Sequence, residues 1–204
     1  MPASTTKPFK LPSSLPVMVL EGCYLLPGGI QPLFIFEERY RRMLEHALDT
    51  DRMFCLGESV CRYDLRPITT AGVIASSMRA ADGTSQMILH GIQRVRITDW
   101  EQDDPFMIAS VEPFETEPGS PSHVAELCVR TFVLLEKMKE SEPAETIRLL
   151  RDLITTRKEP EFICDLVAAM VVTSPLTRRA ILYESSLVRR FEILNEELCN
   201  PSAP

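Results

Sequence analysis

The sequence predicts an α+β fold, with a β-rich N-terminal half that contains one inserted helix and a C-terminal half that is helical. Short apolar runs bounded by turn residues dominate the first half, and residues 53–56 (Met-Phe-Cys-Leu) have the pattern of a strand buried on both faces. Beyond about residue 120, apolar residues recur at the three-and-four spacing of helices. Between the halves, residues 115–122 are rich in Glu, Pro and Ser, which is typical of a linker. We therefore expect a disordered tail over residues 1–14, a β-rich unit over 15–117 and a helical bundle over 118–204.

The stretch from Pro27 to Leu44 combines a turn, a strand and the start of a helix. Gly28-Gly29 gives the backbone the freedom that a sharp turn needs, and residues 33–36 (Leu-Phe-Ile-Phe) have the composition of a strand. From Glu37 the period becomes helical, and acidic residues in the first turn favour the positive end of the helix dipole. One apolar face of this helix comprises Tyr40, Met43, Leu44, Ala47 and Leu48.

The rest of the first half predicts further strands around a tight hairpin. We expect these strands over residues 17–20, 71–75, 86–97 and 106–111. Asp82-Gly83 tolerates the positive φ angles of a tight antiparallel turn. Gly91 predicts a bulge or a barrel corner within the returning strand. Alternation along that strand separates two faces, one with Met87, Leu89, Val95 and Ile97 and the other with His90, Arg94 and Arg96.

Four apolar stripes predict four helices in the second half, and hence a small helical bundle. The first two stripes cover residues 124–138 and 147–154, and Pro160 opens a third helix at a position where proline is favoured. Ser174-Pro175 is an N-cap pair, which predicts the start of the longest helix. Its near-heptad stripe comprises Leu176, Ala180, Tyr183, Leu187, Phe191, Leu194 and Leu198.

Two signatures carry a resemblance to a known family. The opening region holds Pro27-Gly28, Pro32-Leu33, Ile35-Phe36-Glu37, Arg39-Tyr40-Arg41 and Met43, and residues 89–97 have the form Leu-x-Gly-x-x-Arg-x-x-Ile. These segments resemble the Lon substrate-binding domain, the N-terminal module of ATP-dependent Lon proteases, which also occurs alone in bacteria. Phe34 stands where that family commonly has histidine. A looser similarity in the helical half extends the resemblance over residues 15–198.

The resemblance implies both a fold and a function. It implies a PUA-like pseudobarrel with the helix of residues 37–48 inserted, and a four-helix bundle packed behind the barrel. It also implies a substrate-recognition module in a standalone form that lacks the ATPase and peptidase domains.

Composition and charge limit the partners. The formal net charge of −7 argues against non-specific binding to nucleic acid or to an anionic membrane, although a local basic patch is left open. The arginines that could contribute to such a patch are Arg39, Arg41, Arg42, Arg94 and Arg96. We expect no membrane-spanning segment and no signal peptide. The six cysteines lack the spacing of zinc or redox sites, and Cys55, Cys128 and Cys164 lie in apolar runs, which favours buried thiols and a reducing cytoplasm.

The chemistry-bearing residues do not form a catalytic pattern. Within these 204 residues there is no phosphate-binding loop, no Gly-x-Ser-x-Gly elbow and no His-Glu-x-x-His helix. The three histidines, His46, His90 and His123, fall on separate predicted elements. We therefore expect no catalytic residue, no metal site and no cofactor.

The residues best suited to bind a polypeptide gather around the opening strand and the second signature, as an aromatic floor with a polar rim. The candidate binding residues are Phe34, Phe36, Glu37, Arg39, Tyr40, His90 and Arg94. A structural role is the favoured alternative for several of them. The two phenylalanines would then pack under the following helix, and Glu37 and Arg94 would form an ion pair or a cap that holds the helix to the barrel.

We therefore expect a non-enzymatic module that binds unfolded or tagged polypeptide segments, as an adaptor in protein quality control. A protease or a chaperone is the expected partner machinery, and a homodimer is left open. A PUA-like RNA-binding protein is the first alternative, which requires a contiguous basic face. A small-molecule hydrolase is the second, which requires a deep pocket that gathers His90 with a carboxylate and a Ser or Cys.

Overall fold

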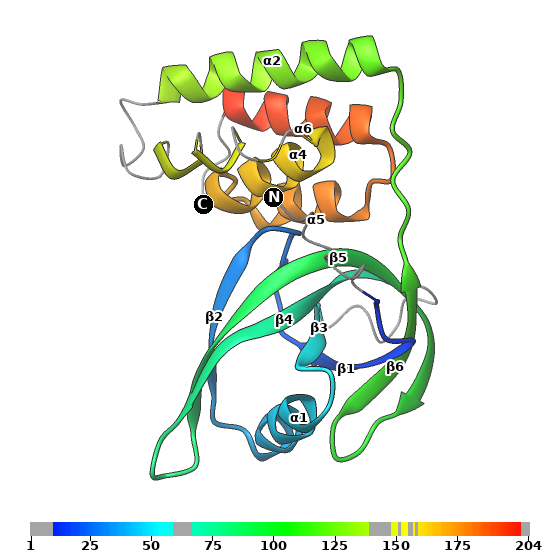
Figure 1. The fold of residues 1–204 in the computed structure, drawn as a ribbon, viewed down its shortest axis with the longest axis vertical. Coiled ribbons are helices and arrows are strands. Elements are labelled where there is room, and N and C mark those ends of the chain that lie inside the picture. The colour runs from blue at the N-terminus through cyan, green and yellow to red at the C-terminus, as the bar shows by residue number, and fades with distance from the viewer. Residues whose placement is uncertain are drawn as a thin grey trace, which may run out of the picture.

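The computed structural model describes residues 10–58, 67–138, 148–150, 152–154, 157 and 159–200. Most of the predicted tail, and Cys61, lie outside these residues. A β-rich unit forms one layer and a helical unit the other, with the helical unit over one end of the barrel and α1 at the opposite end (Figure 1). The predicted α+β fold is confirmed.

Within the described residues, the β-rich unit contains six strands and one helix. They are β1 (Ser14–Val19), β2 (Ile30–Ile35), α1 (Glu38–Asp49), β3 (Met53–Gly57), β4 (Ile68–Arg79), β5 (Ser85–Gln102) and β6 (Met107–Pro113). The strand order is β2-β5-β4-β3-β1-β6, and β5 also pairs with β6. Only the β1–β3 pair is parallel among the described pairs. Because the long β5 strand pairs with β4 along its first part and with β6 along its last, the sheet closes on itself (Figure 1).

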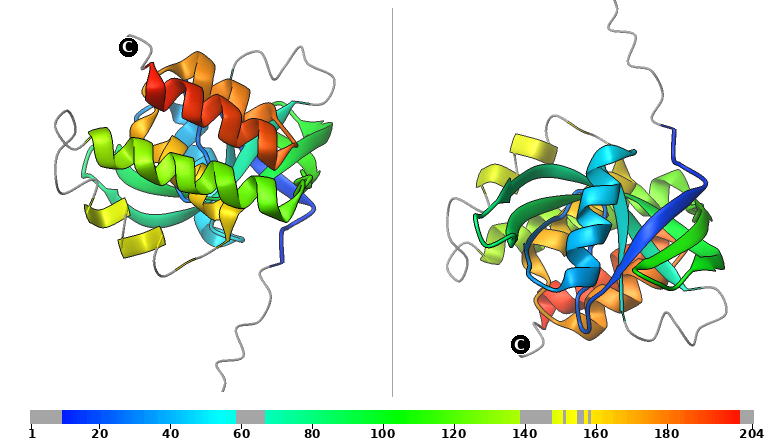
Figure 2. Two further views of the ribbon diagram at one scale, coloured as in Figure 1. Left: turned by 90° about the horizontal axis from the view of Figure 1, so that it is seen from above. Right: turned by 90° about the horizontal axis from the view of Figure 1, so that it is seen from below.

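The sheet separates two apolar clusters, which explains the continuous apolar run in β3. Phe54 and Leu56 face the cluster that contains the buried α1 residues, while Met53 and Cys55 face a second cluster on the other side of the strand, with Val17, Val95 and Ala109. All five residues of β3 are buried, as the sequence predicts. The inserted helix thus covers an end of the barrel and buries one side of the central strands (Figure 2).

Gly91 marks an irregularity in β5, as predicted. The β4–β5 register shifts there, since Ala71 lies opposite Gln93 and Gly72 lies opposite Gly91. A Cβ atom added at Gly91 would lie 2.4 Å from the carbonyl oxygen of Leu26. Only glycine allows the segment before β2 to approach the strand so closely.

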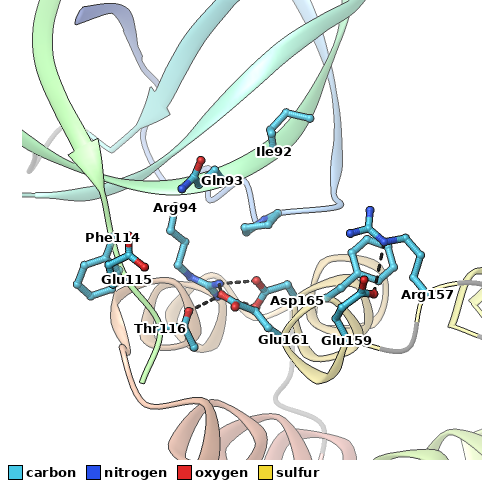
Figure 3. A pocket seen from close by; sticks show the side chains of 12 residues that line it. Ile92, Gln93, Arg94, Phe114, Glu115, Thr116, Arg157, Glu159, Glu161 and Asp165 are labelled. Atoms are coloured by element: carbon cyan, nitrogen blue, oxygen red, sulfur yellow. Dashed lines mark hydrogen bonds and ion pairs between the residues drawn. The ribbon is translucent and has the colours of Figure 1, made fainter. Parts of the chain in front are cut away.

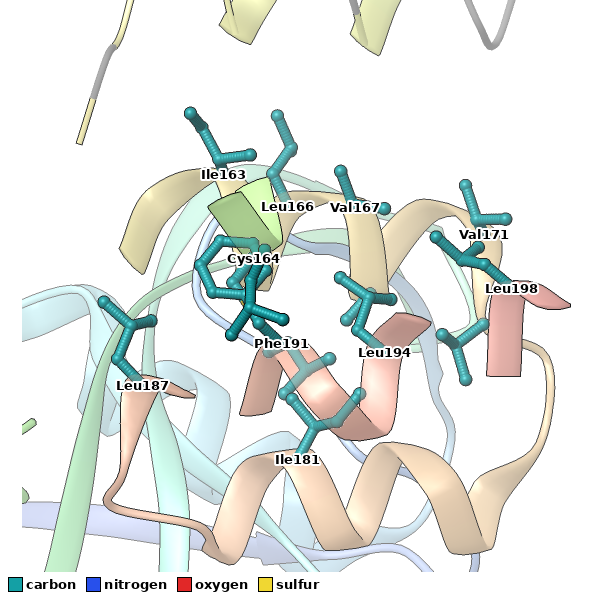
Figure 4. Packing of buried hydrophobic residues seen from close by; sticks show 14 of the residues in the cluster. Ile163, Cys164, Leu166, Val167, Val171, Ile181, Leu187, Phe191, Leu194 and Leu198 are labelled. Atoms are coloured by element: carbon teal, nitrogen blue, oxygen red, sulfur yellow. The ribbon is translucent and has the colours of Figure 1, made fainter. Parts of the chain in front are cut away.

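The helical unit comprises α2 (Pro121–Lys137), α4 (Pro160–Val171), α5 (Pro175–Tyr183) and α6 (Leu187–Cys199). Its core is built from the stripes that the sequence predicts, including Ile163, Val167, Phe191 and Leu194 (Figure 4). Residues 148–150 and 152–154, the described parts of the predicted second helix, are helical. The cluster also includes Tyr24, Leu26 and Ile68 from the β-rich unit, so the two units share a core. The division of the chain at residue 118 stays a prediction.

The prediction of one longest helix after Ser174-Pro175 is wrong. The segment forms two helices, α5 and α6, and the 17-residue α2 is longer than either. Ser186 caps α6, since its hydroxyl accepts a hydrogen bond from the Arg189 backbone N–H at 3.4 Å. At the break, the Glu117 N–H donates to the Ser185 carbonyl and the Glu117 carbonyl accepts from the Leu187 N–H, each at 3.0 Å. Glu117 of the linker therefore occupies hydrogen-bonding groups that a continuous helix would use internally.

Candidate functional site

Three neighbouring strands bring apolar side chains onto the outside of the sheet. Pro32 of β2 lies opposite Ile88 of β5, and both Phe34 and Met78 of β4 lie opposite Gln86. Because side chains alternate along a strand, these residues share one face. We call this surface the apolar face, which comprises Ile30, Pro32, Phe34, Phe36, Met78 and Ile88. The residues between them in sequence, such as Ile35, Met87 and Leu89, are buried on the inner side.

The apolar face is exposed and uncharged. Phe34 is 57% exposed, Phe36 58%, Ile30 65% and Met78 67%. Beside them is a hollow of about 690 Å³, whose lining residues are all uncharged. Its lining comprises Pro32, Leu33, Phe34, Ser76, Ser77, Met78, Gln86, Met87 and Ile88. Contiguous exposed apolar side chains of this kind typically mark an interaction site.

The favoured prediction that Phe34 and Phe36 pack under the following helix is wrong. The two rings instead stack on each other, with centroids 5.9 Å apart and an interplanar angle of 27°. Helix α1 buries Met43, Leu44 and Ala47 against the inner side of the sheet, where Ile35 also lies. The two phenylalanines are therefore more than half exposed, and both also line a small hollow with Tyr40 of α1.

Tyr40 lines a second, smaller hollow next to β2, which is the first strand in the order of the sheet and pairs with β5. This hollow has a volume of about 240 Å³, and Met18, Leu20 and Phe36 also line it. The Tyr40 hydroxyl donates a hydrogen bond to the Val19 carbonyl at 2.9 Å, which ties α1 to the end of β1. Burial, followed by the nearby Glu37 carboxylate, raises the pKa of the Tyr40 phenol. Tyr40 is therefore a neutral wall of this hollow.

Glu37 and Arg39 lie at the start of α1, where Glu37 lines the end of the smaller hollow and Arg39 lines a separate polar hollow next to Asp103 and Asp104. Glu37 occupies the N-cap position with an extended backbone, and its side chain makes no capping hydrogen bond. Its carboxylate instead pairs with Arg39 Nε at 3.5 Å, and both side chains are about half exposed. These residues form a charged rim at one end of an otherwise uncharged surface.

His90 and Arg94, on the same strand, fall in different environments. His90 lies on the apolar face, opposite Ile30 of β2 and Val73 of β4, and is half-buried. Arg94 is only 3% exposed and points into the junction between the barrel and the helices (Figure 3). The structure therefore places His90 on the same face of the sheet as Phe34, four residues from its partner Gln86, and separates Arg94 from that face.

Arg94 is part of a buried ionic network. Its guanidinium forms a two-pronged pair with Asp165, in which Nη2 lies 2.7 Å from Oδ1 and Nη1 contacts Oδ2. Arg94 Nε also donates to the Leu182 carbonyl at 3.2 Å. The structural ion pair predicted for Arg94 is thus present, but its partner is Asp165 of α4 rather than Glu37. Arg94 holds the helical bundle, not α1, to the barrel.

Asp165 also pairs with a second buried arginine that the sequence analysis missed. Arg190 Nη1 lies 3.2 Å from Asp165 Oδ1, and Arg190 Nη2 donates to Thr116 Oγ1 at 2.6 Å. Neither Arg190 nor Asp165 is more than 1% exposed. A polar hollow of about 340 Å³ adjoins this network (Figure 3). The sequence offered one signal, Asp165 between the apolar residues Cys164 and Leu166 of α4, and none for Arg190, which follows Arg189 in a helix with several other polar residues.

Four of the five arginines of the suggested basic patch are either buried or paired with a carboxylate. Arg94 is buried, and three of the others pair with carboxylates within 4 Å. These pairs are Arg39–Glu37, Arg42–Glu38 and Arg96–Glu112.

The histidines lie in separate surroundings. The His46 ring contacts Phe106, His90 lies on the apolar face, and His123 is in the first turn of α2. In the described part of the chain, no cluster of three or more potential metal-binding side chains occurs. None of the helices described here has both the length and the apolar character needed to span a bilayer.

The closed sheet, the inserted helix and the bundle define a member of a known class. Residues 14–200 match the family described as the ATP-dependent protease La (LON) substrate-binding domain, and the chain belongs to that family. The chain is 26% identical over 191 residues to the Lon protease of Escherichia coli strain K12, an alignment that covers 88% of this chain and 24% of that protein. It is also 26% identical over 164 residues to the Lon protease of Dictyoglomus thermophilum, which covers 78% of this chain and 21% of that protein. The chain thus spans less than a quarter of the length of these relatives.

Two solved structures share the fold. The N-terminal domain of Mycobacterium avium complex Lon protease superposes with a TM-score of 0.73 at 17% identity, over 93% of this chain and 100% of that domain. A Lon N-terminal domain protein from Xanthomonas campestris gives 0.56 at 22% identity, over 89% and 96%. The PUA-like barrel and helical bundle implied by the sequence resemblance therefore correspond to a fold known from experiment.

Proposed function

We propose that this chain is a recognition module that binds unfolded or tagged polypeptide segments through its apolar face. The observation that carries this proposal is the set of large, exposed and uncharged side chains on three adjacent strands. Membership of the Lon substrate-binding family supports it, since the family description itself refers to substrates.

The chemistry of the face indicates weak and broadly selective binding. Burying a large apolar side chain contributes about 1.5–3 kcal/mol, and association itself costs several kcal/mol. Contact with a few such residues therefore supports reversible binding with dissociation constants of about micromolar to millimolar. This range suits a module that must hold and then release many different segments.

The finer parts of the proposal concern the cellular role. We propose that the chain acts without catalysis of its own, as an adaptor that delivers polypeptides to a protease or a chaperone in the cytoplasm. The family relationship to Lon proteases supports a role connected with proteolysis. The apolar face has no Lys or Arg among its residues, and RNA binding relies on cationic groups along the contact surface. The chemistry of the face therefore supports polypeptide rather than RNA as the ligand.

The test is binding of a fluorescently labelled unfolded protein, such as reduced and alkylated casein, measured by anisotropy. Phe34→Ala should weaken binding about ten-fold, because it removes an exposed apolar side chain at the centre of the face. Arg39→Ala should weaken it less, since Arg39 lies at the rim and pairs with Glu37.

Leu176→Ala provides the matched control. Leu176 is 79% exposed on α5, against 57% for Phe34, so its removal deletes an even more exposed apolar side chain that is not part of the apolar face. Equal affinities for the wild type, Phe34→Ala and Leu176→Ala would contradict the proposal. Equal losses in the two variants would contradict the location of the site.

A further inference from the structure

Strand β2 lies at one end of the sheet and has a free edge. In the described part of the chain it pairs only with β5, while the barrel closes through β5 and β6 without it. A strand edge presents backbone N–H and C=O groups that another extended chain can pair with.

The register shows which backbone groups of β2 face that free edge. The Gly91 N–H donates to the Gly29 carbonyl at 2.9 Å, which fixes the phase of the β2–β5 pairing. Since antiparallel pairs alternate, the residues turned toward β5 are Gln31, Leu33 and Ile35. The backbone groups of Ile30, Pro32 and Phe34 accordingly point to the free edge.

Two features of Pro32 agree with this assignment. Proline has no N–H, so it is tolerated in a sheet where the missing donor would face away from the partner strand. The Pro32 carbonyl accepts a hydrogen bond from the Gln31 side-chain amide at 3.1 Å. A neighbouring side chain thus occupies an acceptor that an added strand would use.

Hollows flank this edge on both sides of the sheet. The larger one, of about 690 Å³, lies along the outer face at Pro32 and Phe34. The smaller one, of about 240 Å³, lies along Pro32 to Phe36 and is also lined by Met18, Leu20 and Tyr40. An extended chain directs alternate side chains to opposite sides, so a strand beside β2 would direct one set of side chains toward each hollow.

The charge of the two hollows limits the occupant. Among their lining residues only Glu37 has an acidic or basic side chain of the Asp, Glu, Lys or Arg type, and it lies at the end next to α1. A charged side chain from the occupant would lose hydration along most of the edge without gaining a counter-charge. Charge complementarity therefore favours an uncharged segment.

We propose that the edge of β2 takes an extended, uncharged and apolar polypeptide segment as an added strand of the sheet. The proposal rests on the polypeptide-binding function given above and specifies its ligand and binding mode. Backbone hydrogen bonds supply affinity that is independent of the client's sequence, and the two hollows select apolar side chains. Because Pro32 lacks a donor and its carbonyl already accepts from Gln31, the added strand forms two hydrogen bonds fewer than a full ladder, which favours release.

Backbone methylation tests this mode directly. Three peptides with one uncharged, apolar sequence would be compared by anisotropy with the intact chain: the parent, and two isomers that are N-methylated at odd or at even positions. An added strand turns only alternate N–H groups toward β2. One isomer should therefore lose at least about ten-fold in affinity, while the other binds within about three-fold of the parent.

The outcomes separate this proposal from the proposed function. If both isomers bind as well as the parent, or both lose affinity equally, strand addition is wrong, and Phe34→Ala still decides whether the apolar face binds polypeptides. If neither the parent peptide nor casein binds, the proposed function itself fails. If sedimentation shows a dimer of the chain that peptide does not dissociate, the edge is an interface between copies, and strand addition by a client is wrong.

A substitution at the edge gives an independent readout. Pro32→Val adds an N–H that faces the free edge, so it should tighten binding of the parent peptide about five-fold. Far-UV circular dichroism would verify that the variant is folded. The N-methylated isomer that blocks pairing should gain nothing from Pro32→Val, and an equal gain for all three peptides would contradict a backbone contact.

Discussion

Asp165 provides the buried negative charge that compensates two arginines at the junction between barrel and bundle. Its carboxylate lies between two guanidinium groups, from Arg94 and Arg190, and all three side chains are almost fully buried. Arg190 Nε has no hydrogen-bond partner in the described structure, so the network is already short of acceptors. Removing one negative charge would leave two buried cations with only Glu161, which is half exposed, to compensate them.

We therefore expect Asp165→Asn to lower the free energy of unfolding by about 3–5 kcal/mol, the usual cost of breaking a buried ion pair on one side. Urea denaturation would measure the change. Glu159→Gln is the control, because Glu159 pairs with Arg157 on an exposed surface and should change stability by less than about 1 kcal/mol. Similar losses in the two variants would contradict the special role of Asp165.

At the scale of elements, hydrophobic patterning predicted most strands and helices correctly. The alternation in β5 and the continuous apolar run of β3 both correspond to buried positions. Hydrophobic patterning failed where the same sequence pattern is compatible with two different structures. Alternation places Phe34 and Phe36 on the same face but does not reveal which face α1 covers. The partner of Arg94 lies 71 residues away, a distance at which local sequence carries no signal.

The break between α5 and α6 was missed because the apolar spacing continues across it, from Tyr183 to Leu187. The competing signal was Ser186, whose hydroxyl caps α6. Ser186→Ala should lower the free energy of unfolding by about 1 kcal/mol, through loss of that cap. Ser120→Ala is the matched control, since Ser120 occupies the N-cap position of α2 without a capping hydrogen bond. If Ser120→Ala is as harmful as Ser186→Ala, the capping bond is not the cause.

At the scale of the whole molecule, the barrel and the bundle are joined by both charge and apolar contacts. The Arg94–Asp165 pair crosses the junction, and Leu26 and Ile68 of the β-rich unit belong to the core of the helical unit. Domains that share a core in this way generally unfold together.

We expect one cooperative unfolding transition for the wild type. Trp100, the only tryptophan in the sequence, lies on β5 and reports on the barrel, whereas far-UV circular dichroism is dominated by the helices. The two signals should give the same urea midpoint. Separate midpoints in the wild type would show that the junction does not couple the units.

The closed sheet does not need β2, because β5 pairs with both β4 and β6 in its absence. The outward side chains of β2 therefore contribute little to closure of the barrel. Exposed side chains outside the shared signature, at positions 30 and 34, can therefore be exchanged without loss of the closed sheet. Diversity among relatives should accordingly concentrate at these two positions, whereas the signature residues Pro32 and Phe36 and the inward neighbour Ile35 should vary far less.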